Sequence, residues 1–352
     1  MQSLAFVLVL VLVSLAVPAG AMGQSDVAPA APELRYFGRW DQSGKDVYVS
    51  QWSGAYVKVG FTGDRVTVRL DNAKPSSFYV LVDGREPQHV TDKTGEVELA
   101  VGAGGGDGTH QLKLVAEVGK ELRFGGVRPG EGQSLKPARL HAGHVLFIGD
   151  SITRGASATN LTLDAWAPAS ADSAGLEHDR IAQGGIGLVS GFDAPAGKVG
   201  MEEAFFKLGQ FGSPGGNNSY PAEADRQPTL IVINLGTNDG NRNEKNPVPM
   251  DVFQQRHVGF VTKLRERYPD ATILALQLFN TLAREKNEAI EAAVQQVNAG
   301  GDKNVHYVST HGWVDPNPKG GDIAPDWSHP TDQGHHKLTA KMAEVLKQYV
   351  NK

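Results

Sequence analysis

Apolar and polar residues alternate in short runs through the first third of the chain, between residues 34 and 128. A period of two is typical of strands with one buried face. Turn-forming segments rich in Gly and Asp, such as Asp83-Gly84, separate the runs. The six clearest runs are residues 47–49, 55–61, 66–70, 78–82, 97–101 and 111–115. Because no helical period interrupts them, residues 34–130 are predicted to form a β-sandwich or jelly-roll domain.

Beyond residue 143 the alternation gives way to continuous apolar runs, which are typical of parallel strands buried on both faces. These runs are residues 145–148, 230–233, 271–278 and 305–308. Helical periods lie between and after them, at residues 250–268, 285–298 and 331–349. Alternating strands and helices predict an α/β domain with a parallel sheet over residues 144–352. Residues 186–227, rich in Gly, Pro, Asn and Ser, are expected to form a long loop near the active face.

The N-terminus carries an apolar run at residues 4–17, too short to span a bilayer comfortably. Ala19-Gly20-Ala21 follows as an A-x-A cleavage site, so residues 1–21 are predicted to be a secretory signal peptide. The preceding residues 1–3 contain no Lys or Arg, which leaves an uncleaved membrane anchor as the alternative. Linkers are expected at residues 22–33 and 131–143, between the signal peptide and the two domains.

Composition excludes several classes of binding partner and catalytic group. The formal charge is −5 and there is no Lys/Arg block, which argues against nucleic acid or an anionic lipid surface as partner. The chain has no cysteine, which excludes disulfides, thiolate metal sites and a cysteine nucleophile. The eleven histidines show no metal-ligand spacing; His335 and His336 fall in the last predicted helix. No metal, cofactor or stable membrane insertion after signal cleavage is therefore expected.

Three polar segments lie where their chemistry can combine. Residues 149–155 and 234–240 each follow a predicted buried strand, and residues 326–330 precede the last helix. Ligands of open α/β sheets bind beyond the carboxyl ends of the strands, so the three segments should converge. Ser151 is a candidate nucleophile and His329 its base. Asp326, three residues before His329, is placed to orient the imidazole.

A negatively charged acyl-transfer intermediate also needs fixed hydrogen-bond donors. Ser151 lies at a strand-to-helix turn, where backbone N–H groups are free. The side-chain amide of Asn238 and a glycine N–H are candidates for the remaining donors, and Asp239 is expected to shape the turn that carries Asn238. Each segment alone is a common turn, whereas all of them in this order at strand ends predict an esterase.

These segments resemble the conserved blocks of the SGNH (GDSL-type) hydrolases. Gly149-Asp150-Ser151 matches the first block, residues 183–187 look like the second, Gly236-Thr237-Asn238-Asp239 matches the third, and residues 326–330 match the fifth. The resemblance implies a flavodoxin-like, three-layer α/β hydrolase domain. It also implies that Ser151 is the nucleophile and an oxyanion donor, His329 the base and Asp326 its orienting acid. Gly185 and Asn238 would complete the oxyanion hole, with Gly184 or Gly187 as alternatives to Gly185.

A β-rich domain before such a hydrolase resembles the two-domain acetylxylan esterases of carbohydrate esterase family 2. The N-terminal residues 36–40, 52–54, 57–63 and 79–84 carry this part of the likeness. It implies a secreted serine esterase that deacetylates a carbohydrate such as acetylated xylan. Members of that group often lack the orienting aspartate and use a backbone carbonyl, whereas Asp326 occupies the motif position here.

Other interpretations keep part of this picture. Trp327 and Trp166 are candidates for sugar contacts, and so is Trp313, because aromatic faces suit sugar rings. The same mechanism could serve a lipase, a thioesterase or a peptidoglycan O-acetylesterase, although the polar loop 186–227 argues against long acyl chains. A third possibility is a carbohydrate-binding module with weak residual esterase activity.

Overall fold

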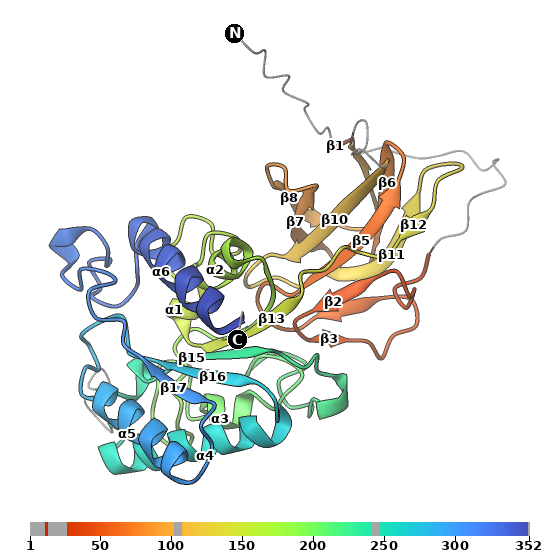
Figure 1. Cartoon of the computed structure of the whole chain (residues 1–352). Coiled ribbons are helices and arrows are strands. Elements are labelled where there is room, and N and C mark those ends of the chain that lie inside the picture. Colours follow the sequence, from red (N-terminus) through yellow and green to blue (C-terminus); the bar gives the residue numbers. More distant parts are fainter. Residues whose placement is uncertain (1–10, 13–26, 102–107, 241–246, 351–352) are drawn as a thin grey trace. The chain divides into compact units, whose positions relative to one another are not determined.

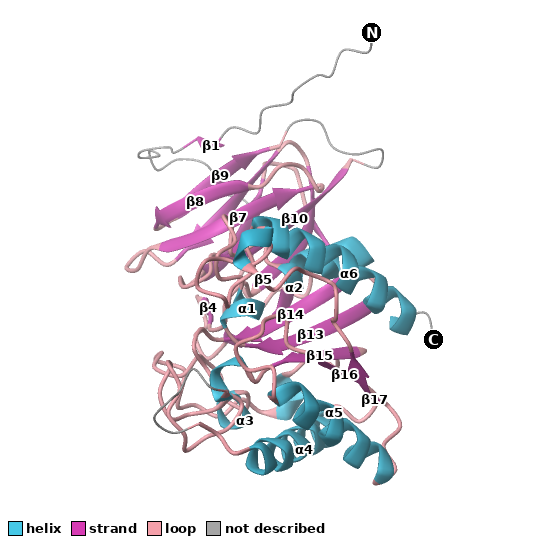
Figure 2. Ribbon diagram, turned by 90° about the vertical axis from the view of Figure 1, so that its left-hand side faces the viewer, coloured by secondary structure: helices cyan, strands magenta, loops and turns pink. Residues whose placement is uncertain are grey.

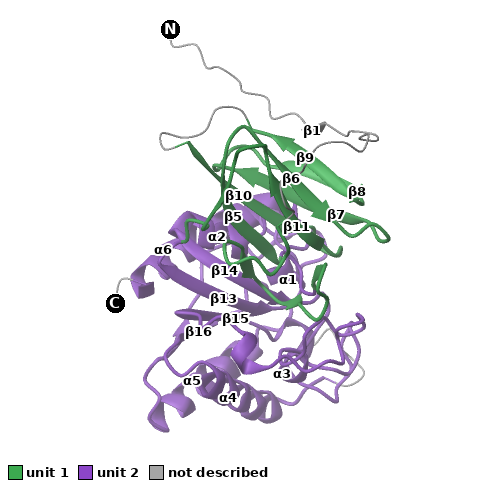
Figure 3. Cartoon of the chain, turned by 90° about the vertical axis from the view of Figure 1, so that its right-hand side faces the viewer, with its two compact units in different colours: residues 1–50, 55–140 green, residues 51–54, 141–352 purple. Residues whose placement is uncertain are grey.

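The computed structural model describes residues 11–12, 27–101, 108–240 and 247–350. The chain forms two compact units (Figure 3). Residues 1–50 and 55–140 make up the first unit, and residues 51–54 and 141–352 make up the second. The short segment 51–54 therefore belongs to the second unit, although its neighbours in sequence on both sides belong to the first.

The first unit consists of two antiparallel sheets, as the alternating pattern predicted. One sheet has the order β1-β9-β6-β11-β4-β3; the other has the order β12-β5-β10-β7-β8, with β2 paired to β5. The strands are β1 (Val11–Leu12), β2 (Arg35–Phe37), β3 (Trp40–Asp41), β4 (Tyr48–Ser50), β5 (Tyr56–Thr62), β6 (Arg65–Leu70), β7 (Ser76–Val82), β8 (Gln88–Lys93), β9 (Glu96–Ala100), β10 (Thr109–Ala116), β11 (Arg123–Pro129) and β12 (Leu135–Lys136).

Alternate residues of these strands enter one shared core. On β6, Val66 and Val68 are buried between exposed or half-buried neighbours, and on β10 His110 and Leu112 are buried in the same way. Each side chain points to the opposite face from its neighbour, so a period of two in the sequence becomes one apolar face. β8 had no such pattern because Val90 is its only buried residue. Of the predicted signal peptide, only β1 falls within the described residues.

The second unit is built on a parallel sheet with strand order β14-β13-β15-β16-β17 (Figure 1). The strands are β13 (Gly143–Gly149), β14 (Leu176–Ala182), β15 (Leu230–Asn234), β16 (Thr272–Leu276) and β17 (Val305–Val308). The helices and 3-10 turns are α1 (Ser151–Arg154), α2 (Trp166–Ala174), α3 (Met201–Ala204), η1 (Ala222–Ala224), η2 (Thr237–Asp239), α4 (Met250–Arg267), α5 (Lys286–Ala299), η3 (Pro318–Gly320) and α6 (Asp332–Val350). This is the flavodoxin-like order, in which the second strand along the chain lies at an edge.

Helices cover both faces of this sheet, α1, α2 and α6 on one side and α3, α4 and α5 on the other (Figure 2). Val145 and Phe147 of β13 share a core cluster with α2 and α6. Leu146 and Ile148 share the other cluster with α4 and α5. Because successive side chains face opposite ways, an uninterrupted apolar run is what a strand between two helix layers requires. The predicted three-layer α/β hydrolase fold is confirmed.

β14 and α2 are among the elements of this unit that were not predicted. β14 contains Glu177, His178, Asp179 and Arg180, so it has no apolar run, and α2 lies in a stretch where no helix was expected. The segment 186–227 is mostly loop, as expected, but Leu188 and Phe205 from it are buried in the core. No helix in the described part of the chain is long and apolar enough to cross a membrane.

Candidate active site

Ser151 begins α1 immediately after the central strand β13. Asp150 caps this helix by accepting a hydrogen bond from the Ile152 N–H at 2.9 Å. Gly149 is required here, since a Cβ atom at this position would lie 2.1 Å from Oγ1 of Thr153. Gly155 ends the helix in the left-handed conformation, at φ 107°. The result is a tight strand-to-helix turn that presents Ser151 at the carboxyl edge of the sheet.

His329 and Asp326 lie together on a loop between β17 and α6. His329 Nε2 is 2.8 Å from Ser151 Oγ, and His329 Nδ1 is 2.5 Å from Asp326 Oδ2. The loop is closed at its base by a bridge between Ile323 and Pro330. These distances are those of a hydrogen-bonded nucleophile, base and orienting acid.

The Asp326 carboxylate is held as an acceptor. Its Oδ1 accepts the backbone N–H groups of Ser328 at 2.8 Å and of His329 at 3.0 Å. Burial alone would raise the pKa of Asp326, but these bonds and the His329 ring outweigh it, so the pKa lies below its usual range. Asp326 is therefore ionised at neutral pH and can hold the Nδ1–H tautomer of His329.

Asn238, in η2 after β15, connects the third block to the first two. Its Nδ2 donates to the Ile186 carbonyl at 2.9 Å and lies 3.4 Å from Asp150 Oδ2. The side chain is 6% exposed. In the described part of the chain no hydrogen bond engages the backbone N–H of Ser151 or Gly185.

The three glycines of the second block occupy different environments. A Cβ atom on Gly184 would lie 3.9 Å from the Cβ of Ser151, so Gly184 adjoins Ser151. Gly185 has a φ of 75°, and a Cβ there would lie 2.9 Å from Pro195. Gly187 instead packs on the Asp239 carboxylate, which a Cβ would approach to 2.9 Å. Of the three, Gly187 is placed for packing rather than for the nucleophile.

Two fully buried carboxyl groups support the site. Asp239 accepts the backbone N–H groups of Leu188 at 2.7 Å and Val189 at 2.9 Å, and thereby clasps the second block to the third. Burial raises the pKa of Asp239 to about 6 despite these bonds. Burial, with the nearby Asp239 charge as a smaller cause, raises the pKa of Asp150 to about 7. Asp239, which was expected to shape the third-block turn, thus binds that turn to Leu188 and Val189.

The three tryptophans differ in access. The prediction that Trp166 contacts sugar is wrong, because Trp166 begins α2, is 0% exposed, and donates its Nε1–H to the Ile152 carbonyl. Trp313 stacks on Phe279 beside the core. Trp327 is 49% exposed, two residues before His329, with a φ of 62° that a non-glycine residue rarely adopts. Backbone strain of this kind concentrates at functional sites.

Arg180 of β14 is a supporting residue that the sequence did not reveal. It is 2% exposed, and its guanidinium donates to the carbonyl oxygens of Arg154, Leu161, Thr162 and Ser53. Burial lowers the pKa of Arg180 to about 9. By binding the carbonyl at the end of α1, Arg180 stabilises the turn that carries Ser151. A lone arginine in a mixed polar stretch gives no sequence signal of this.

The segment 51–54 contributes to the same region. Trp52 is 2% exposed within the hydrolase core, and Ser53 Oγ accepts a hydrogen bond from Gln210 at 2.8 Å. The adjoining Phe211 exchanges two backbone hydrogen bonds with the Gln183 side chain. Gln183 precedes the second-block glycines, so this segment supports the loop beside Ser151. The described residues contain no group of three or more His, Asp or Glu that could hold a metal ion.

Comparison with known proteins agrees with this geometry. The model of the carbohydrate esterase 2 N-terminal domain matches residues 36–138, and that of the GDSL-like lipase/acylhydrolase family matches residues 145–342. None of the curated proteins matches the chain in sequence.

Solved structures of two-domain esterases align along nearly the whole chain. A family two carbohydrate esterase from Clostridium thermocellum, in complex with cellohexaose, is 25% identical with a TM-score of 0.73, covering 90% of this chain and 99% of that one. A carbohydrate esterase family 2 enzyme from Corynascus thermopiles is 22% identical with a TM-score of 0.72, covering 91% and 100%. An acetyl xylan esterase from Butyrivibrio proteoclasticus is 17% identical with a TM-score of 0.72, covering 93% and 98%. The chain is thus a carboxylic ester hydrolase that belongs to the GDSL-like lipase/acylhydrolase (SGNH) family and is of the carbohydrate esterase family 2 type.

Proposed function

We propose that this carbohydrate esterase is a secreted acetylesterase that removes acetyl groups from a polysaccharide such as acetylated xylan. Ser151, His329 and Asp326 would form its catalytic triad. The observation that carries the proposal is the continuous hydrogen-bonded chain from Ser151 Oγ through both nitrogens of His329 to Asp326. Catalysis of this kind needs neither metal nor cofactor.

In the acylation step, Ser151 Oγ attacks the carbonyl carbon of the acetyl ester while His329 Nε2 accepts the hydroxyl proton. Asp326 keeps the Nδ1–H in place and stabilises the imidazolium that forms. His329 then donates this proton to the departing sugar hydroxyl, and an acetyl-enzyme remains. His329 then takes a proton from a water molecule as that water attacks the acetyl-enzyme, and it returns the proton to Ser151 Oγ as acetate leaves.

The charge on the tetrahedral intermediate would be stabilised by three donors: the backbone N–H groups of Ser151 and Gly185 and the side-chain amide of Asn238. The first two carry no other hydrogen bond in the described part of the chain. One N–H of Asn238 is fixed by the Ile186 carbonyl, whereas the other is only loosely held, 3.4 Å from Asp150. That second N–H would exchange its long bond to Asp150 for a bond to the oxyanion. Gly184, beside the Ser151 side chain, is the alternative to Gly185.

A carbohydrate acetyl ester fits the surroundings of the triad. Trp327 presents a large exposed aromatic face next to His329, and such faces stack on sugar rings. Among the structural relatives, one was solved with cellohexaose and another is an acetyl xylan esterase. Secretion rests on the apolar run at residues 4–17 and the Ala19-Gly20-Ala21 cleavage site.

The decisive experiment is acetate release from acetylated xylan, mannan, pectin and peptidoglycan by the full-length protein and by Ser151→Ala. Wild-type protein should release acetate from at least one plant polysaccharide, and Ser151→Ala should lower kcat by about 10⁴- to 10⁶-fold. Release from peptidoglycan alone would favour the O-acetylesterase alternative. Equal activity of both proteins on 4-nitrophenyl acetate would leave a binding module and refute the proposed nucleophile.

A further inference from the structure

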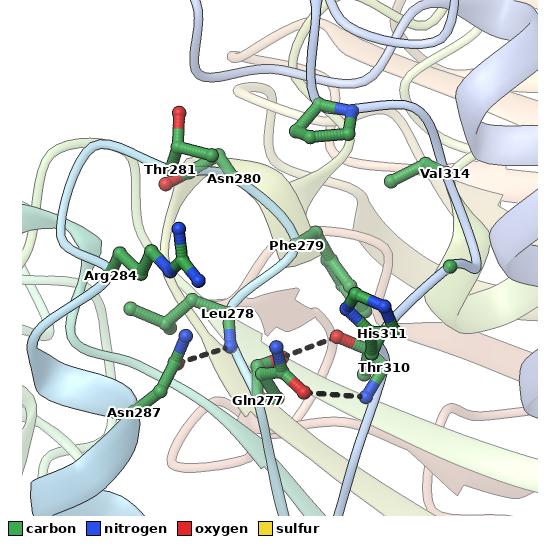
Figure 4. A pocket seen from close by; sticks show the side chains of 12 residues that line it. Gln277, Leu278, Phe279, Asn280, Thr281, Arg284, Asn287, Thr310, His311 and Val314 are labelled. Atoms are coloured by element: carbon green, nitrogen blue, oxygen red, sulfur yellow. Dashed lines mark hydrogen bonds between the residues drawn. The ribbon is translucent and has the colours of Figure 1, made fainter.

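A hollow opens in the hydrolase unit at the carboxyl ends of β16 and β17. Its volume is about 250 Å³, and the residues around it come from the two segments that follow these strands, 277–287 and 310–316 (Figure 4). This is the edge of the sheet where α/β proteins bind ligands. None of the catalytic residues lines it.

One side of the hollow is apolar. Phe279 and Val314 line it while remaining 5% and 8% exposed, and Leu278 and Pro316 complete this surface. A sugar ring presents C–H groups on its faces and hydroxyl groups around its edge. Pockets that hold such amphipathic ligands combine an apolar surface with a few fixed polar groups.

The polar groups that remain open are donors. Asn287 Oδ1 accepts the Leu278 N–H at 2.9 Å. Gln277 Oε1 accepts the Ser309 hydroxyl at 2.8 Å and the Thr310 N–H at 3.2 Å. The oxygen ends of both amides are thus occupied by the protein, which leaves their NH₂ groups available (Figure 4).

Arg284 adds a positive charge to these donors. Its side chain is exposed and lines the hollow, and it has no ion pair or hydrogen bond within the described part of the chain. No residue that lines the hollow is acidic. A wider depression next to it shares Gln277, Arg284 and Asn287 with the hollow and is also lined by Glu285, Glu288 and Glu291. These carboxylates would repel an anion, so a negatively charged group is favoured on the side of Arg284 that faces the inner hollow.

Asn280 connects the hollow to the catalytic loops. This buried lining residue has its Nδ2 3.4 Å from Thr237 Oγ1 and 3.4 Å from the Ser328 carbonyl. Thr237 precedes Asn238, and Ser328 precedes His329. The hollow therefore adjoins the loops that carry Asn238 and His329.

The geometry points to a subsite for a carboxylate-bearing sugar unit, such as a uronic acid substituent, of the same acetylated polysaccharide. Arg284 binds the carboxylate through its planar guanidinium, the amide NH₂ groups bind ring oxygens, and Phe279 and Val314 contact the ring face. This inference rests on the proposed function, because it gives the acetylated carbohydrate an acidic substituent.

The test is calorimetric binding to full-length Ser151→Ala protein, which cannot consume its ligand. The ligands are two unacetylated xylo-oligosaccharides of equal length, one with and one without a glucuronic acid substituent. The acidic oligosaccharide should bind about tenfold more tightly, and less so at high salt. Adding Arg284→Gln should reduce this difference to within about twofold, and Arg284→Lys should keep part of it because the charge remains.

Lys347→Gln removes the same charge from an exposed residue of α6 that does not line the hollow, and it should leave the tenfold difference intact. Equal binding of the two ligands by the parent protein would overturn the subsite, and so would an equal weakening of both by Arg284→Gln. Free glucuronic acid should bind far more weakly than the substituted oligosaccharide; equally tight binding would indicate a simple anion site and also overturn it. Failure of the wild-type protein to release acetate from any carbohydrate would refute the proposed function separately, without changing these binding results.

Discussion

Replacing Asp239 by asparagine tests whether the second block is positioned by this buried carboxylate. Asp239 uses both oxygens, one for the Leu188 N–H and one for the Val189 N–H, at 2.7 and 2.9 Å. Asparagine offers only one oxygen, so one of the two N–H groups would face an NH₂ group and lose its partner. The contact between the second and third blocks would then lose one of its two hydrogen bonds, while the volume of the side chain stays the same.

The magnitude follows from the burial of this contact. A buried N–H left without a partner costs about 1–3 kcal/mol. Because burial raises the pKa of Asp239 to about 6, the ionised wild-type carboxylate carries a cost of its own that asparagine lacks. The two effects are of similar size and opposite sign, so the net change in stability should stay within about 1 kcal/mol, equivalent to about 2–4 °C in Tm for a unit of this size.

The effect on kcat should be larger than the net change in stability. Leu188 and Val189 follow the second-block glycines directly, so their displacement moves the backbone beside Ser151. Misplacement of an oxyanion donor by about 1 Å lowers kcat by about 10²-fold, and a partial shift by about tenfold. KM should change little, because the donor acts mainly on the transition state.

The assay is steady-state hydrolysis of 4-nitrophenyl acetate together with thermal unfolding, for Asp239→Asn and for the exposed control Asp270→Asn. Gly187→Ala perturbs the same clasp from the other side, since its Cβ would lie 2.9 Å from Asp239 Oδ1, and it should lower kcat as well. A kcat within twofold of wild type for a folded Asp239→Asn protein would refute the positioning role.

Three further predictions follow from the same site and its support. Asp326→Ala should lower kcat less than His329→Ala does, because the base survives without its orienting acid; equal loss in two folded variants, measured on 4-nitrophenyl acetate, would contradict this. Trp52→Ala should destabilise the hydrolase unit by about 3–5 kcal/mol, since it leaves a large cavity in the core, and an unchanged urea midpoint would contradict that burial. Burial raises the pKa of Asp150 to about 7, from about 3.9 in an unfolded chain, so the folded state binds the extra proton. Stability from this group is therefore lost as pH rises from about 4 to about 7, and the urea midpoint of Asp150→Asn should fall less over that range than that of wild type.

Much of the fold could be predicted from hydrophobic periodicity. Residues 145–148 and 230–233 are apolar throughout because the strands lie between two helix layers, and Val66 and Val68 alternate with polar residues because their sheet has one buried face. β14 was not predicted by this reasoning, because polar residues interrupt its apolar pattern. Periodicity reports burial against apolar neighbours, and it gives no signal where polar side chains are buried among carbonyl groups.

The candidate site likewise contains residues that the sequence could locate and residues that it could not. Ser151, Asn238 and His329 could be located because each follows or precedes a regular element in a recognisable local motif, and local motifs are properties of consecutive residues. Trp166 shows the limit of this reasoning. The sequence around an aromatic residue does not tell whether the ring faces a sugar or the core, and only the packing of α2 shows that Trp166 is buried.

What the tertiary structure alone decided are the contacts between residues far apart in the chain. Arg180 binds carbonyl oxygens of the loop after α1 and of Ser53, Asp239 holds two N–H groups of the second block, and Trp52 enters the hydrolase core from the first third of the chain. Their residue types are compatible with many surface positions, so the sequence does not distinguish them. A hydrogen bond or a buried ring acquires its energy from the partner that the fold brings within a few ångströms, and that partner is specified by the folded sheet and its helices, not by neighbours in sequence.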